Sequence, residues 1–216
     1  MPRTPARETA GDFYDVFELP DSRIGLIVAD VADKGMGAAL YMAVSRTLLR
    51  IYSSENQGQP DIVLQETNRR LLADTQADLF VSVFYGVLDP ITGRLIYANA
   101  GHNPPIHLSS QGDQPVRHLN PTGMIAGVLE EAEWGTETIM LCPGDMLVAF
   151  SDGVIDAQND DGDFFEEQRL QVLVENSWGN PAQKVQEDLL SQIGQFVGDA
   201  PQFDDITLLV LTRKHL

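Results

Sequence analysis

Apolar residues recur along the chain in two spacings, one typical of strands and one typical of helices. Short, nearly continuous apolar runs predict β-strands. We expect strands at 13–19, 24–29, 79–88, 95–98, 106–108, 116–119, 138–141, 146–150 and 205–211. Apolar residues three or four positions apart predict amphipathic helices. We expect helices at 38–52, 61–73, 167–178 and 181–197.

The run at 79–88 is apolar at almost every position. A strand with one face in water would alternate, so this strand is expected to be covered on both faces. Two helix pairs and many antiparallel strands pack most economically as two sheets with a helix pair outside each. No repeat or linker divides the chain. The pattern therefore predicts one α+β domain over 1–216, a four-layer αββα sandwich of two mostly antiparallel sheets flanked by helix pairs.

Acidic residues stand where several of these strands begin or end. They are Asp12, Asp30, Asp152, Asp204 and Asp205. The turn at 20–22 makes a hairpin that brings Asp12 and Asp30 to the same end. Since neighbouring antiparallel strands begin and end side by side, all these carboxylates can reach one sheet edge. Each acid alone is also a common turn residue, but their shared position at strand ends favours one common site.

Clustered carboxylates repel one another strongly. A cluster is tolerated only when cations neutralise it or when some of its groups stay protonated. Hard divalent cations prefer oxygen ligands of this kind. The sequence therefore predicts a site for divalent metal ions at this edge.

The charge and the cysteine content exclude several classes of protein. With 14 basic and 32 acidic residues the formal charge is −18, which argues against nucleic acid or an anionic membrane as partner. Cys142 is the single cysteine, so an internal disulfide is excluded and a reducing cytoplasm is expected. No apolar stretch approaches the roughly 18 residues of a membrane span. The first residues lack the apolar core of a signal peptide.

Five segments, taken in order, resemble a known bacterial family. They read GDFYDVF, ADVADKGMGAAL, VSVFYGVLDPITGRLIYANAGHNPP, PGDMLVAFSDGVIDA and FDDITLLVL. The family is the stage II sporulation E (SpoIIE) type of serine phosphatase domain, a branch of the metal-dependent protein phosphatases (PPM, protein phosphatase type 2C). The resemblance runs from about residue 6 to residue 213.

The resemblance implies an αββα sandwich that binds two Mn²⁺ or Mg²⁺ ions. By position, the metal carboxylates would be Asp12, Asp30, Asp152 and Asp204. The backbone carbonyl of Val31 would be a further ligand. Asp205 would be either a direct ligand or a neighbour of the ligands.

The resemblance also implies a substrate and partners. Phosphatases of this type act on phosphoserine or phosphothreonine of an anti-sigma-factor antagonist, which then binds a kinase-like anti-sigma factor in stress signalling. Three features depart from the family: Ala10 replaces a glycine, 164–166 lacks a Phe-Gly pair, and an upstream strand and helix are missing. The last departure leads us to expect the catalytic part of a longer protein with an upstream sensor domain.

Phosphomonoester hydrolysis depends mainly on positioning and on neutralising charge. Two divalent ions about 3.5–4 Å apart can share a water, lower its pKa and produce a bridging hydroxide that attacks phosphorus. Two alternatives remain open: an inactive phosphoprotein-binding scaffold of the same fold, and a hydrolase of small phosphoesters. His102 has two interpretations, as a general acid or phosphate contact, or as a residue whose hydrogen bonds shape its loop.

Overall fold

The computed structural model describes residues 3–4, 11–56, 58–74, 79–111, 115–202 and 204–214. Its contacts divide the chain into two compact units. Unit 1 comprises Met1–Glu8, Pro105–Leu119 and Leu141–Leu216, and unit 2 comprises Thr9–Pro104 and Asn120–Met140. Each unit contains one antiparallel sheet and its own helices.

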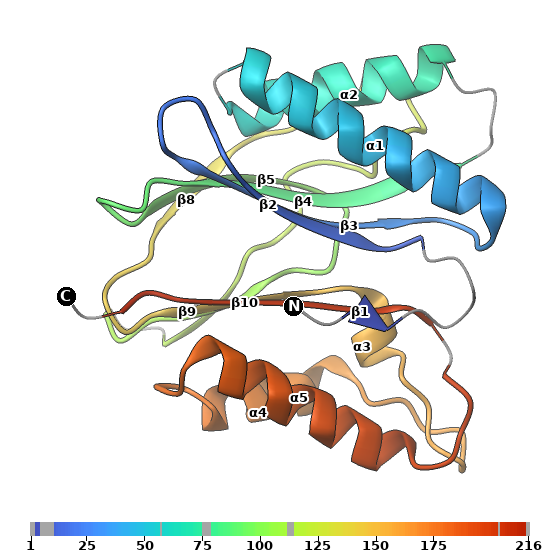
Figure 1. The fold of residues 1–216 in the computed structure, drawn as a ribbon, viewed down its shortest axis with the longest axis vertical. Helices are drawn as coiled ribbons and strands as arrows, with labels where there is room; N and C mark the ends of the chain where they lie inside the picture. Colours follow the sequence, from blue (N-terminus) through green and yellow to red (C-terminus); the bar gives the residue numbers. More distant parts are fainter. Residues whose placement is uncertain are drawn as a thin grey trace. The chain divides into compact units, whose positions relative to one another are not determined.

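Unit 2 is a five-stranded sheet with the strand order β2-β3-β4-β5-β8. These strands are β2 (Phe13–Glu18), β3 (Ile24–Val31), β4 (Val81–Leu88), β5 (Arg94–Ala100) and β8 (Glu137–Met140). The helices α1 (Met36–Glu55) and α2 (Pro60–Asp74) cover one face of this sheet (Figure 1). Leu49 and Leu64 of the helices join Ala29, Val83 and Tyr85 of the strands in one buried core.

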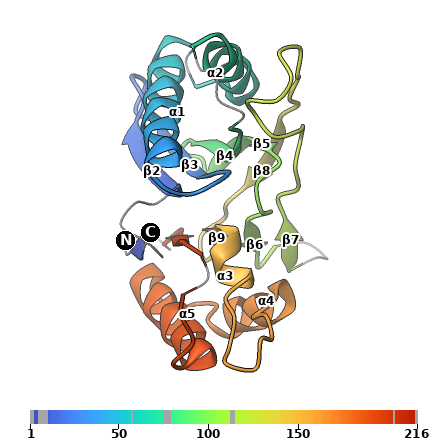
Figure 2. The same ribbon diagram turned by 90° about the vertical axis from the view of Figure 1, so that its right-hand side faces the viewer.

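Unit 1 is a second five-stranded sheet, with the order β1-β10-β9-β6-β7. Its strands are β1 (Arg3–Thr4), β6 (Ile106–Leu108), β7 (Val116–His118), β9 (Met146–Phe150) and β10 (Ile206–Thr212). Its helices are α3 (Asp152–Ile155), α4 (Glu167–Asn176) and α5 (Ala182–Val197). Figure 2 shows α4 and α5 on one side of this sheet. Phe150 and Leu208 pack with Leu170 and Leu189 in its core.

The predicted elements are present, with shifted ends. Every residue of β4 except Ser82 is buried, which confirms that both faces of this strand are covered. The prediction that helix α1 begins at residue 38 was wrong. Gly35 precedes the helix in a non-helical conformation, with a φ of 99° that favours glycine, and the helix begins at Met36. The short helix α3 was missed because one turn carries no periodic signal. No helix in the described ranges combines the length and apolarity needed to cross a membrane.

Candidate metal centre

Unit 2 brings two of the predicted acids together. Asp12 directly precedes β2, and Asp30 is the penultimate residue of β3. The register pairs Phe13 with Ala29, which places Asp12 opposite Asp30. Opposite residues of antiparallel strands share a face, with Cβ atoms about 4.5–5.5 Å apart. Asp12 is buried and Asp30 is half-buried. The prediction that the hairpin joins these two carboxylates is confirmed.

Gly11 lies against the backbone that follows Asp30. A Cβ built on Gly11 would lie 3.0 Å from the carbonyl oxygen of Val31 and 3.7 Å from Oδ1 of Asp30. The Val31 carbonyl and the Asp30 carboxylate therefore border the same space, which a larger residue at position 11 would enter. The family resemblance implies both of these groups, together with Asp12, as metal ligands in this unit. Ala10, the noted departure from the family, lies outside the described residues.

Unit 1 brings the other predicted acids together. Asp152 directly follows Ser151 at the end of β9, and the Ser151 amide donates to the Thr207 carbonyl of β10 (3.0 Å). A Cβ on Gly153 would lie only 1.9 Å from the carbonyl oxygen of Asp205. The Asp152–Gly153 turn therefore packs directly on the backbone that carries Asp204 and Asp205. Asp204 is half-buried and Asp205 is buried.

Asp156 is an acid of this group that the sequence analysis did not single out. Burial, reinforced by the negative charge of Asp204, raises the pKa of Asp156 above its ordinary value. The α3 turn brings Asp156 back toward Asp152, since the Asp156 amide donates to the Asp152 carbonyl (2.8 Å). The i, i+4 spacing of these two acids within SDGVIDA was the available signal. Unit 1 therefore concentrates negative charge beside Asp204.

The donors in both units are of one chemical kind. Carboxylates and a backbone carbonyl are hard oxygen ligands, which fit Mg²⁺ and Mn²⁺ better than softer metals. Over the ranges that the structure describes, no three His, Cys, Asp or Glu side chains form a group that would hold a metal ion. That the acids of both units contribute to one site stays a prediction.

His102 is buried and held on both its backbone and its side chain. Its amide donates to Oδ1 of Asn99 (2.8 Å), and Nδ2 of Asn99 donates to its carbonyl (3.1 Å). Its Nδ1 lies 2.8 Å from Oγ of Ser82. These contacts agree with the interpretation that His102 shapes its loop.

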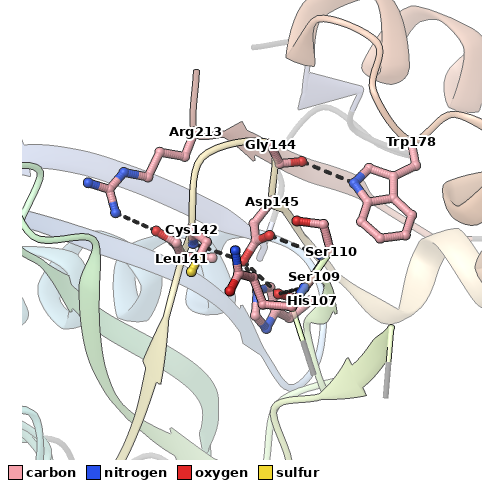
Figure 3. A network of polar contacts seen from close by, with 10 residues as sticks. His107, Ser109, Ser110, Leu141, Cys142, Gly144, Asp145, Trp178 and Arg213 are labelled. Carbon is pink, nitrogen blue, oxygen red and sulfur yellow. Dashed lines mark hydrogen bonds and ion pairs between the residues drawn. The ribbon is translucent and has the colours of Figure 1, made fainter. Parts of the chain in front are cut away.

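A second polar cluster lies in unit 1, around the buried carboxylate of Asp145 (Figure 3). Oδ2 of Asp145 accepts from Ser109 Oγ (2.9 Å) and the Cys142 amide (2.9 Å), and lies 3.2 Å from Nε2 of His107. Burial lowers the pKa of His107 although Asp145 opposes this shift. Ser109 donates to the carboxylate rather than to the imidazole, so the cluster is not a Ser-His-Asp nucleophile arrangement. It joins β6 to the turn before β9.

Comparison with known proteins identifies the family. The sequence model described as Stage II sporulation protein E (SpoIIE) matches residues 20–214. The chain belongs to this family. It is similar to Protein IcfG of Synechocystis sp., with 35% identity over 97% of this chain and 37% of that protein. It is also similar to phosphoserine phosphatase RsbU of Bacillus subtilis, with 31% identity over 97% of this chain and 61% of that protein. The chain thus spans 37% and 61% of the length of these two relatives.

A solved structure of another protein has a fold similar to that of this chain. The SiaA-PP2C domain of Pseudomonas aeruginosa matches with a TM-score of 0.86 at 21% identity, over 98% of this chain and 84% of that one. At this identity the likeness concerns the fold alone. It confirms the predicted α+β class with two antiparallel sheets and their helices.

Proposed function

We propose that this chain is a metal-dependent protein serine/threonine phosphatase. The main observation behind this proposal is that an aspartate stands at each carboxylate position implied by the family. In addition, each unit brings its own donors together near strand ends. The similarity to RsbU, which is named a phosphoserine phosphatase, supports the same activity. A scaffold that had lost catalysis would be expected to lack one or more of these acids.

In this proposal the residues hold two divalent ions, Mn²⁺ or Mg²⁺. Asp12, Asp30 and the Val31 carbonyl contribute from unit 2, and Asp152 and Asp204 contribute from unit 1, with Asp205 beside Asp204. When bound, such ions lower the pKa of a shared water and neutralise phosphate charge. The carboxylates would fix where the ions are held, and the packing of Gly11 and Gly153 against backbone keeps the ligands in place.

The proposed substrate is phosphoserine or phosphothreonine on an anti-sigma-factor antagonist, so that dephosphorylation switches the antagonist between partners. The family resemblance and the RsbU likeness support this proposal. On the family resemblance we also propose an upstream sensor domain; the chain spans 37% and 61% of two of its relatives. The proposed location is the cytoplasm, where sigma factors act.

The test measures hydrolysis of p-nitrophenyl phosphate and of a phosphoserine protein, with Mn²⁺ and with EDTA. Asp30→Asn and Asp152→Asn remove one predicted ligand from each unit. Each should reduce turnover by more than the 10–100-fold typical of residues that only support ligands. Asp188→Asn on α5 makes the same charge change at a surface ion pair with Lys184 and should leave turnover unchanged. Full activity in EDTA, or in both ligand variants, would refute the metal-dependent mechanism.

A further inference from the structure

A row of polar residues crosses three neighbouring strands of unit 2. The register of β2 and β3 places Asp12, the residue before β2, opposite Asp30, and the register of β3 and β4 pairs Asp30 with Ser82. Opposite residues share a face of the sheet and lie within side-chain reach. Ser82 is the single residue of β4 that is not buried. Ser82 is therefore the cross-strand neighbour, on the same face of the sheet, of a carboxylate that we assign to metal binding.

The row continues from Ser82 to His102. Nδ1 of His102 lies 2.8 Å from Oγ of Ser82. The backbone that carries the imidazole is held in place, because the Asn99 side chain bonds the His102 amide and carbonyl while the Asn99 amide donates to Thr122 Oγ1 (3.0 Å). The His102 side chain is also buried. Gly101 completes this support, since its φ of 67° favours glycine and an added Cβ would lie 2.5 Å from Cγ2 of Ile125. These contacts hold the loop so that Nδ1 of His102 lies at hydrogen-bond distance from Oγ of Ser82.

We propose that Ser82 and His102 are positioning residues for Asp30. His102 Nδ1–H donates to Ser82 Oγ, and the Ser82 hydroxyl donates its own proton to the Asp30 carboxylate. If Ser82 Oγ donated to His102 Nδ1 instead, its single proton would be engaged there. The Ser82 oxygen lone pairs would then face the Asp30 carboxylate, which is repulsive. Outer hydrogen bonds of this kind fix the orientation of ligating groups and raise metal affinity. The inference rests on the proposed function, which makes Asp30 a metal ligand.

The experiment is calorimetric titration of the purified chain with Mn²⁺ alone, without substrate. Ser82→Ala should raise the Mn²⁺ dissociation constant about 10–100-fold. Ser82→Thr keeps the hydroxyl and should stay within roughly threefold of the wild type. Ser45→Ala is the matched control, because Ser45 is a fully buried serine of the same unit on α1 and is not part of the row. It should bind Mn²⁺ as the wild type does.

His102 supplies a second, independent arm. His102→Asn keeps an N–H near the Nδ1 position and should retain most of the Mn²⁺ affinity, whereas His102→Phe should lose it as Ser82→Ala does. Because the two residues act in series, His102→Phe should cost no further affinity once Ser82 is alanine. A purely structural role would lower the melting temperature of these variants and leave their Mn²⁺ affinity unchanged.

The outcomes separate this inference from the proposed function. A wild-type chain that binds no Mn²⁺ overturns the metal-dependent phosphatase, and the positioning role with it. A wild type that binds Mn²⁺ while Ser82→Ala and His102→Phe bind it equally well overturns the positioning role alone. If Ser82→Ala fails to fold, the comparison of His102→Asn with His102→Phe decides in the same way.

Discussion

Replacing Gly153 by alanine tests how closely the turn after β9 packs on the residues before β10. The added Cβ would lie 1.9 Å from the Asp205 carbonyl oxygen and 2.8 Å from its carbonyl carbon. A carbon and a carbonyl oxygen approach no closer than about 3.3 Å, so the two backbones would have to separate by roughly 1.4 Å. Both contacting atoms belong to backbone, which cannot rotate away as a flexible side chain would.

This separation should reduce both stability and metal affinity. Overpacking of a well-packed site costs about 1–3 kcal/mol, and the shortness of this contact places Gly153→Ala near about 3 kcal/mol. In a chain of this size that cost corresponds to a fall in melting temperature of about 6–12 °C. Displacing Asp204 by about 1 Å exceeds the roughly 0.5 Å tolerance of a functional site, so Mn²⁺ affinity should fall more than about tenfold.

The matched control is a second glycine-to-alanine substitution in the same unit, which should raise the stability instead of lowering it. Gly194 lies within α5, and a Cβ added there would meet no atom within 4 Å. Gly194→Ala should stabilise the helix by about 0.5–1 kcal/mol and raise the melting temperature by about 1–4 °C. Thermal melting and Mn²⁺ titration are read on both variants. A Gly153→Ala protein that melts with the wild type and binds Mn²⁺ equally well would refute the packing described for Asp152 and Asp205.

Two further predictions concern ionisable groups away from the proposed ligands. Buried Asp15 accepts hydrogen bonds from Nε and Nη2 of Arg50, so Asp15→Asn should lower the free energy of unfolding in urea by about 1–3 kcal/mol. Burial alone would raise the pKa of Asp15, but Arg50 and Arg46 outweigh burial and lower the pKa below 3.8. The difference in unfolding free energy between Asp15→Asn and the wild type should therefore vanish only below pH 3.8. A constant difference down to about pH 2 would contradict this reasoning. For His107, whose pKa burial lowers below 6.5, the unfolded chain takes up the proton first, so stability should fall as pH drops from about 6.5 and His107→Gln should flatten that slope. An equal slope in both proteins would show that His107 is not responsible.

Those parts of the fold and the site that depend only on residues close together in the sequence could be predicted. Two apolar runs and the turn at 20–22 predicted the hairpin, and the hairpin alone brings Asp12 and Asp30 together. Likewise, the apolar run at 146–150 predicted a strand, and Asp152 lies two residues beyond its end, as the first residue of α3. The helices were predicted because burial of one face leaves a period of three to four residues in the sequence.

The supporting contacts could not be predicted, because they depend on register between distant segments. Ser82 and His102 meet only because β3, β4 and β5 are aligned as they are, and a shift by one residue would turn Ser82 to the other face. Asp156 reaches Asp204 through a single helical turn that is too short for a periodic signal. For Ser82 the visible trace was a lone polar residue within an apolar segment, and for Asp156 it was the i, i+4 spacing from Asp152.

The central claim is that carboxylates from both units hold two divalent ions in one site. Anomalous diffraction from crystals of the chain soaked in Mn²⁺ tests it most directly. We predict two manganese peaks, whose ligands include Asp12, Asp30 and the Val31 carbonyl from unit 2 and Asp152 and Asp204 from unit 1. Manganese bound at other residues, or within one unit without the acids of the other, would contradict the claim.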